Sequence, residues 1–328
     1  MRLAILGAGA WGTAFALAQA NRHGLRLWTW DAAHADEMRA TRENSFLRGY
    51  PLPPTFLLTS DFDEALDGAE LAVVATPTAA LRSVLERLGR RPAVPPVIWL
   101  CKGFESGSAL FPHQVAEATL PAGVPRGALS GPSFADEIAR GLPAAVTLAS
   151  PDLEFADRVA KAVHGPRLRV YSTDDLPGVE VGGAVKNVMA IAAGISDGLG
   201  FGLSARAALM TRGLAEITRL GLKLGGRLET FLGLAGAGDL ILTCTGDLSR
   251  NRRVGLALAK GQTLETILAD LGHVAEGVST AREVRRLAER HGIDMPITTA
   301  VCRLLDGEIS ATAAAEALLR RDQKSERQ

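Results

Sequence analysis

Apolar runs with few polar interruptions alternate with helix-compatible stretches through roughly the first 175 residues of the chain. These runs stand at 3–6, 25–30, 70–75, 96–101, 127–130, 144–150 and 168–172. Uninterrupted apolar runs are typical of strands buried on both faces of a parallel sheet. Their alternation with helices predicts an α/β, Rossmann-like, doubly wound sheet.

The pattern changes near Val179, where strand signals fade and long helix-compatible runs begin. We therefore expect a dinucleotide-binding domain over 1–178 and an all-α, substrate-binding domain over 179–328. The predicted segments of the second half are helices over 180–194 and 279–291, helices that begin at Pro296 and Ser310, and loops at 234–239 and 249–253. In the first half, residues 41–60 show no regular pattern.

The first apolar run leads into a glycine-rich turn, Gly7-Ala8-Gly9-Ala10-Trp11-Gly12, and then into a helix. In dinucleotide-binding folds the first glycine makes the tight turn, the second lets the backbone approach a pyrophosphate, and the third packs helix on strand. The helix N-terminus offers free N–H groups to the phosphates. A glycine-rich turn alone is weak evidence, but a strand before it and a helix after it favour a dinucleotide site.

The second apolar run ends at Trp30 and Asp31, where such folds place an acid that binds the ribose. There Asp31 would accept a hydrogen bond from a 2′-hydroxyl and repel a 2′-phosphate. The alternative is that Asp31 caps the helix that begins near Ala32. Trp30 either covers the adenine or fills a gap at the sheet edge. Use of NAD or NADP stays open.

Two later strand ends carry candidate ligand contacts, because open α/β sheets bind ligands beyond the carboxyl ends of their strands. Lys102 follows the run at 96–101, and Gly131-Pro132-Ser133 follows the run at 127–130. The small residues let a ligand approach the backbone, and Ser133 offers a hydroxyl. A helix that begins near Phe134 would add N–H donors.

Lys186 lies within an otherwise small or apolar helical segment. Its neighbours on the predicted helix face are Gly182, Gly183, Met189, Ala190 and Ala193. A buried lysine is costly without a partner, and desolvation lowers its pKa toward the range useful for proton transfer. The alternative is a lysine that snorkels to the surface.

Two polar segments supply further candidates. Asp239 follows a glycine-laced approach at 234–238, and Ser249, Arg250 and Asn251 combine a hydroxyl, a guanidinium and an amide suited to phosphate oxygens. Either segment could instead be an ordinary solvated loop. Together with Lys186 they would supply a base, an orienting acid and a phosphate clamp.

Composition narrows the function classes. The chain has 36 basic and 36 acidic residues among 328, so charge gives no support to a nucleic-acid partner. We find no charged-then-apolar leader and no run of about 18 apolar residues, so we expect no membrane span. The three cysteines have no metal-like spacing and fit a reducing cytoplasm. We expect no metal site.

These motifs together resemble bacterial NAD(P)-dependent glycerol-3-phosphate dehydrogenases over essentially the whole chain. The resemblance rests on 7–14, Lys102-Gly103, 130–135, 182–187, 238–240 and 249–253. It implies reversible reduction of dihydroxyacetone phosphate to sn-glycerol 3-phosphate for glycerophospholipid synthesis, with NADH or NADPH. It also implies a cytoplasmic enzyme, and we expect a homodimer.

The resemblance also assigns roles. Lys186 is implied as the proton donor and acceptor, and we expect Asp239 to orient it. The implied substrate contacts are Lys102, Gly131, Ser133, Lys186, Asp239, Ser249, Arg250 and Asn251. The expected cofactor contacts are Gly7, Gly9, Ala10, Trp11, Gly12, Trp30, Asp31, Lys102, Ala135, Arg250, Val274 and Glu276. The family often has Ser where this chain has Ala10, which offers only a backbone N–H.

Two other functions are open from the residues alone. A dehydrogenase of a 3-hydroxy acid would share the two-domain layout and a helix-borne lysine. A non-catalytic nucleotide sensor would bind the cofactor without turnover, but it leaves Lys186 and Arg250 unexplained.

Overall fold

Eight strands form one sheet in the first half of the molecule, in the order β3-β2-β1-β4-β5-β6-β7-β8. They are β1 (Arg2–Leu6), β2 (Gly24–Trp28), β3 (Leu57–Thr59), β4 (Leu71–Val74), β5 (Val97–Trp99), β6 (Arg126–Ser130), β7 (Ala144–Ala149) and β8 (Leu168–Thr173). Neighbouring strands are parallel except β6 and β7. This computed structural model, which describes residues 1–271 and 275–320, confirms the predicted doubly wound sheet. Strand β3 is the one strand that the apolar pattern did not predict.

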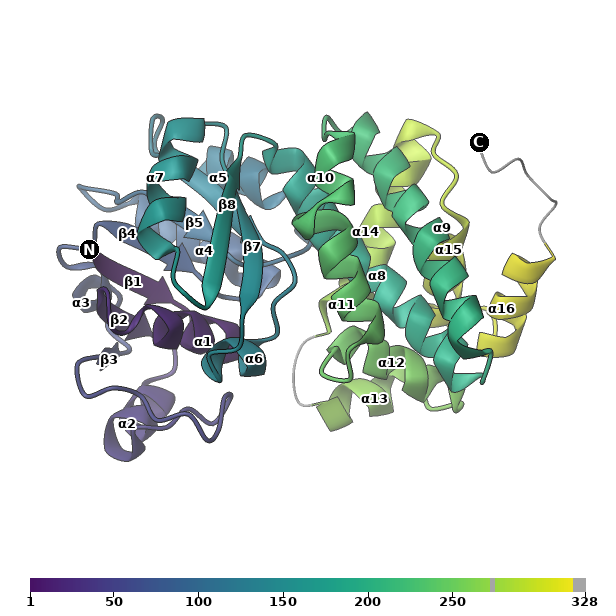
Figure 1. Cartoon of the computed structure of the whole chain (residues 1–328), viewed down its shortest axis with the longest axis horizontal. Helices are drawn as coiled ribbons and strands as arrows, with labels where there is room; N and C mark the ends of the chain where they lie inside the picture. The colour runs from purple at the N-terminus through teal and green to yellow at the C-terminus, as the bar shows by residue number, and fades with distance from the viewer. Residues whose placement is uncertain (272–274, 321–328) are drawn as a thin grey trace.

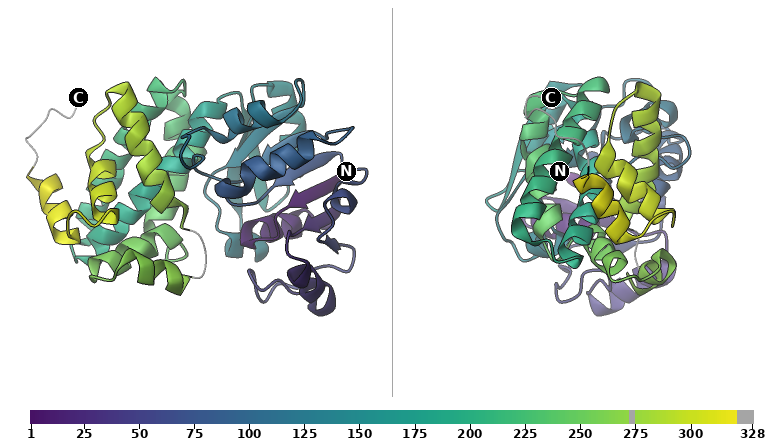
Figure 2. Two further views of the ribbon diagram at one scale, coloured as in Figure 1. Left: turned by 180° about the vertical axis from the view of Figure 1, so that it is seen from behind. Right: turned by 90° about the vertical axis from the view of Figure 1, so that its right-hand side faces the viewer.

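Helices cover both faces of the sheet. They are α1 (Ala10–Gln19), α2 (Ala32–Thr41), α3 (Phe62–Leu66), α4 (Thr78–Gly89), α5 (Pro112–Thr119), α6 (Ala135–Ala139) and α7 (Leu153–Val163). Phe15 of α1 and Phe155 of α7 belong to the apolar cluster on one face, and Phe62 of α3 belongs to the cluster on the other. Figure 1 shows α1 and α7 in front of the sheet, and Figure 2 shows the opposite face from behind.

The second half of the described chain is helical, as predicted. Its elements are α8 (Leu176–Gly198), α9 (Gly202–Lys223), α10 (Leu228–Leu232), a π-helical turn (Leu234–Gly238), α11 (Asp239–Thr245), α12 (Arg250–Ala259), α13 (Leu264–Leu271), α14 (Glu276–His291), α15 (Pro296–Leu305) and α16 (Ala311–Leu319). The loops predicted at 234–239 and 249–253 are wrong. The segment at 234–238 is a π-helical turn that leads directly into α11. The segment at 249–253 is the start of α12, which Ser249 caps by accepting a hydrogen bond from Arg252 N.

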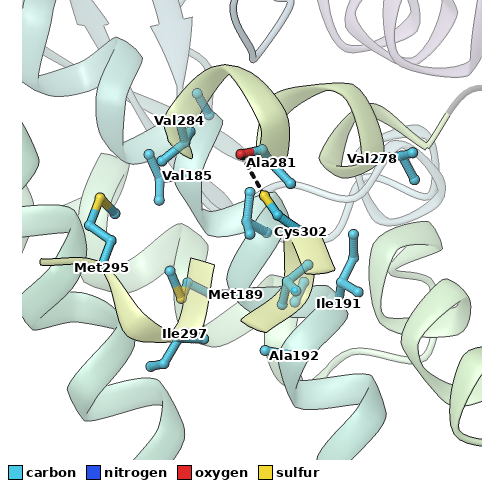
Figure 3. Packing of buried hydrophobic residues seen from close by; sticks show 14 of the residues in the cluster. Val185, Met189, Ile191, Ala192, Val278, Ala281, Val284, Met295, Ile297 and Cys302 are labelled. Atoms are coloured by element: carbon cyan, nitrogen blue, oxygen red, sulfur yellow. Dashed lines mark hydrogen bonds between the residues drawn. The ribbon is translucent and has the colours of Figure 1, made fainter. Parts of the chain in front are cut away.

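Helix α8 is the central element of the second half. Its side chains are buried from Val179 to Ser196, and Figure 3 shows Val185, Met189 and Ile191 packed among residues of α14 and α15. Helix α12 crosses α8 at very short range. A Cβ on Gly194 would lie 2.1 Å from the carbonyl oxygen of Arg252, so only glycine allows this approach.

The same helix also belongs to the sheet half. Leu176 and Val179, in its first turn, lie in the apolar cluster that contains Trp99 and Ala128 of the sheet. From Val181 onward its residues belong to the core of the helical half. The expected division at 178/179 therefore falls within the first turn of a helix that contributes to both cores.

Among the described residues, one helix is long and apolar enough to cross a membrane, and it is α8. Its apolar window is 100% buried inside the protein. Burial within the fold accounts for that composition.

Candidate active site

The glycine-rich turn lies where β1 meets β4, the point at which the strand order reverses and such sheets bind ligands. Gly7 has φ of +125°, and a Cβ there would lie 2.7 Å from the carbonyl carbon of Ala75. A Cβ on Gly12 would lie 2.1 Å from the Gly7 oxygen, so α1 packs directly on the turn. Gly9 is different, because a Cβ there would meet nothing within 4 Å.

These positions fit a dinucleotide. Helix α1 begins at Ala10, and its N-cap, Gly9, supplies no side-chain hydrogen bond to the first turn. The N–H groups of that turn are available to an anion, and Gly9 leaves the space in front of them open. The groups that would hold the pyrophosphate are thus the N–H groups at Ala10 and Trp11.

A buried polar network that the sequence did not predict stabilises this turn. Asn44 donates to the Ala8 carbonyl at 2.9 Å and to Thr13 Oγ1 at 2.7 Å, and His34 Nε2 lies 3.1 Å from Asn44 Oδ1. Asn44 and Thr13 are fully buried. Asn44 lies in the segment without a regular pattern, so no periodicity marked it.

The structure shows that Asp31 caps α2. Its carboxylate accepts from Ala33 N at 2.9 Å and from His34 N at 3.4 Å. Trp30, beside it, is 81% exposed and fills no gap in the sheet edge. The exposed indole, two residues beyond the end of β2, is accessible to an adenine ring.

Three charged side chains from distant parts of the chain meet at the other candidate site. Asp239, the first residue of α11, is 1% exposed and accepts from Lys186 of α8 at 2.5 Å and from Lys102 at 2.6 Å. Each lysine takes a different carboxylate oxygen. Lys186 is itself only 6% exposed, so the alternative of a snorkelling surface lysine is wrong.

The charges shift one another's protonation. The pKa of Lys186 is lowered to about 8, because burial and, to a lesser degree, the Lys102 ammonium lower it more than Asp239 raises it. Burial alone would raise the pKa of Asp239, but the ammonium groups of Lys102 and Lys186 hold it below its usual value. Lys186 thus titrates close to neutral pH, where a proton donor and acceptor is most useful.

Thr243 is the third residue in contact with the Lys186 ammonium, and no sequence pattern marked it. Its hydroxyl accepts from Lys186 Nζ at 2.9 Å and donates to the Asp239 carbonyl at 2.6 Å. It lies one turn beyond Asp239 on α11. The predicted loop hid this spacing, which a helix beginning at Asp239 would have revealed.

The turn after β6 lies beside this cluster. Lys102 Nζ donates to the Gly131 carbonyl at 3.1 Å, and Ser133 donates to the same carbonyl at 3.0 Å. Gly131 has φ of +139°. Trp11 Nε1 donates to the Ser133 carbonyl at 3.1 Å and so joins the glycine-rich turn to this one, immediately before Ala135 begins α6.

The expected phosphate contacts are gathered at the start of α12. Ser249 is its N-cap, and Arg250 is its first residue, with an exposed side chain. Asn251 is buried, and its amide donates to Asn187 at 3.0 Å and accepts from Gly277 N at 3.0 Å. In this arrangement Asn251 joins α8, α12 and α14.

Glu276 begins α14 and accepts from both the N–H and the hydroxyl of Thr78 at 3.4 Å. Thr78 begins α4 beyond the carboxyl end of β4, so this contact links the two halves on the side of the nucleotide turn. Burial raises the pKa of Glu276. Val274 lies outside the described residues. Among those described, no three His, Cys, Asp or Glu side chains group as a metal site.

Comparisons with known proteins identify the family of the chain. Residues 2–156 match the family model described as the N-terminus of NAD-dependent glycerol-3-phosphate dehydrogenase, and residues 175–316 match the corresponding C-terminus. The chain is 59% identical over 327 residues to glycerol-3-phosphate dehydrogenase [NAD(P)+] of Thiobacillus denitrificans, covering 99% of this chain and 100% of that protein. It is 60% identical over 331 residues to the protein of that name from Nitrosospira multiformis, covering 99% of each.

Solved structures show the same relationship. A crystal structure of glycerol-3-phosphate dehydrogenase from Coxiella burnetii superposes with a TM-score of 0.93 and 43% identity, covering 98% of this chain and 99% of that one. A ketopantoate reductase from Ralstonia eutropha, at 15% identity and a TM-score of 0.59 with 96% and 100% covered, shares the fold alone. The chain belongs to the family of NAD-dependent glycerol-3-phosphate dehydrogenases.

Proposed function

We propose that this chain reversibly reduces dihydroxyacetone phosphate to sn-glycerol 3-phosphate with NADH or NADPH, and that Lys186 is its general acid and base. The observation that supports the catalytic assignment is the buried Lys186 ammonium, which lies 2.5 Å from Asp239, while the other oxygen of Asp239 accepts from Lys102 of the sheet half. A lysine held in this way and titrating near pH 8 can both give and take a proton.

The cofactor, when bound, supplies the hydride for C2 of the substrate. Lys186 donates a proton to the C2 oxygen in the reducing direction and removes it in the oxidising direction. Asp239 orients the ammonium through the 2.5 Å contact, and Thr243 fixes it from a second side. Positioned acid–base help of this kind contributes about 10²–10⁴-fold to the rate.

Charge also stabilises the oxygen that becomes an alkoxide. Lys102 and Lys186 place two ammonium groups on one carboxylate, which leaves a net positive charge in a buried region. A fixed cation in a buried region stabilises a developing oxyanion more strongly than water does. Arg250, with Ser249 at the start of α12, is proposed to hold the substrate phosphate through guanidinium and backbone N–H donors.

The cofactor contacts are proposed as predicted from the sequence, with Gly7, Gly9 and Gly12 shaping the turn and Trp30 available to the adenine. We also propose the division at 178/179 into a nucleotide-binding and a substrate-binding part. The product would supply glycerophospholipid synthesis in the cytoplasm, and the enzyme would be a homodimer, which sedimentation velocity tests.

The direct test is oxidation of NADH and of NADPH, each measured with and without dihydroxyacetone phosphate. We expect oxidation that depends on this substrate. A 3-hydroxy-acid dehydrogenase would instead prefer a keto-carboxylate partner, and a nucleotide sensor would bind both cofactors without turnover.

A further inference from the structure

Glu180 is a buried carboxylate at the base of the catalytic helix, and the mechanism above does not use it. It lies on α8, six residues before Lys186, or about 9 Å along the helix axis. It is 7% exposed. A carboxylate is rarely buried unless its oxygens are well satisfied, so its partners identify what it does.

All of its partners belong to the sheet half. Oε1 accepts from Trp99 Nε1 at 3.0 Å and from His113 N at 3.0 Å, and His113 Nδ1 lies 2.5 Å from Oε2. Trp99 is the last residue of β5, and His113 lies in the first turn of α5. One carboxylate therefore ties the catalytic helix to a strand and to a second helix.

The strand tied in this way is the one that leads to Lys102. Trp99 lies three residues before Lys102, so Glu180 joins the two segments that carry the lysines on either side of Asp239. The packing between those segments is tight. A Cβ on Gly183 would lie 2.8 Å from Ser130 Oγ and 3.5 Å from Lys102 Cγ. The cavity between Glu180, Ser130 and Lys102 measures about 10 Å³, at most the space of one water molecule.

We infer that Glu180 is a positioning residue, which sets α8 against β5 through Trp99 and His113 so that Lys186 and Lys102 both reach Asp239. This inference rests on the proposed function. Loss of Glu180 would let the base of α8 shift, and a displacement of about 1 Å at reacting groups costs up to about 10²-fold in rate. None of the hydrogen bonds of Glu180 involves the nucleotide turn at Gly7–Gly12, so we expect that turn to keep its conformation.

The helical half supplies a matched control. Glu216 of α9 is 1% exposed and also accepts three hydrogen bonds, from Ile297 N, Thr298 N and Thr298 Oγ1. Its partners all lie at the start of α15, and none belongs to the sheet half. Glu180→Ala and Glu216→Ala therefore remove equivalent buried carboxylates, only one of which joins the two halves.

The experiment compares both variants with the full-length wild type for Tm, NADH affinity and the pH profile of kcat with dihydroxyacetone phosphate. We expect both to lower Tm, but only Glu180→Ala to reduce kcat, by about ten- to a hundredfold, with NADH affinity within about twofold of wild type. Glu180→Gln keeps an oxygen for Trp99 Nε1 and His113 N, and should restore most of the activity.

The pH profile separates positioning from general destabilisation. The titratable and charged groups that interact with Lys186 are Asp239 and Cys244 of α11, Lys102 beyond β5 and Glu276 of α14, and Arg250 of α12 acts on Glu276. Because Lys102 lowers the pKa of Lys186, moving Lys102 away should shift the alkaline limb of kcat to higher pH in Glu180→Ala. In Glu216→Ala that limb should stay in place.

Each outcome decides the matter. Equal loss of kcat in the two alanine variants, or an unmoved limb in Glu180→Ala, overturns the inference. If Glu180→Ala does not fold, Trp99→Phe removes the Nε1 donor and keeps a smaller aromatic ring at that position. We then expect kcat to fall at least about threefold, and an unchanged kcat overturns the inference. A wild type without substrate-dependent NADH oxidation would overturn the proposed function instead.

Discussion

Lys186 and Asp239 form a buried ion pair between α8 and α11, 2.5 Å apart in space and 53 residues apart in sequence. The second oxygen of Asp239 is taken by Lys102, from the sheet half, so the pair lies where the two halves of the chain meet.

Removal of the Lys186 ammonium should abolish most of the turnover. We expect Lys186→Ala to lower kcat by about 10²–10⁴-fold, because it removes the proton donor, while NADH binding stays near wild type. Lys260→Ala, at the exposed end of α12, is the control and should be fully active. A Lys186→Ala variant as active as wild type would refute the assignment.

The two reaction directions should have opposite pH dependence. Reduction needs the protonated ammonium, so its kcat should fall as the pH rises through about 8, whereas oxidation needs the neutral amine and should increase over the same range. Asp239→Asn removes the charge that raises the pKa of Lys186. In that variant the alkaline limb of the reductive profile should move below pH 8.

Arg250 should act on substrate binding more than on chemistry. Hydrogen bonds to charged groups contribute about 1.5–3 kcal/mol, so Arg250→Ala should raise the KM for dihydroxyacetone phosphate by at least about tenfold. Arg253, three residues later and also exposed, provides a control of the same charge on the same helix. If both variants raise KM equally, the increase reflects the loss of positive charge in general, and Arg250 does not bind the phosphate specifically.

The glycines of the nucleotide turn should separate folding from binding. In Gly12→Ala the new methyl would lie 2.1 Å from the Gly7 oxygen, so we expect a loss of stability of about 1–3 kcal/mol or more in chemical denaturation. Gly9→Ala meets no protein atom within 4 Å. It should keep the wild-type Tm and weaken NADH binding, and a lowered Tm would argue against the open approach at Gly9.

The doubly wound sheet could be predicted from the sequence because strands buried on both faces of a parallel sheet carry short, nearly continuous apolar runs, such as those at 3–6 and 70–75. Strand β3 escaped prediction because it is three residues long at the sheet margin, where its neighbours contribute more than its own composition. The segment at 234–239 looked like a loop because it is rich in glycine. Tertiary contacts override that preference, because the segment packs directly on α8: a Cβ on Gly182 would lie 2.6 Å from the Ala235 oxygen.

The site was predictable where a residue type was out of place, as with a lysine in the apolar sequence of α8. Asn44 and Thr243 gave no such signal, since asparagine and threonine are common everywhere. Glu180 is also a charged residue in the apolar sequence of α8, but its role depends on Trp99 and His113, which are distant in sequence. For Asp31 the sequence left both ribose binding and capping of α2 open, and the structure shows the cap.

The first turn of α8 belongs to the apolar core of the sheet half, and the rest of the helix lies at the centre of the core of the helical half. A fragment ending before it would expose Trp99 and Ala128 to solvent, and a fragment beginning after its first turn would lose its anchor at Asp175, which caps the helix at Gly178 N. Neither fragment is expected to fold when produced separately, and the intact chain should melt in a single calorimetric transition.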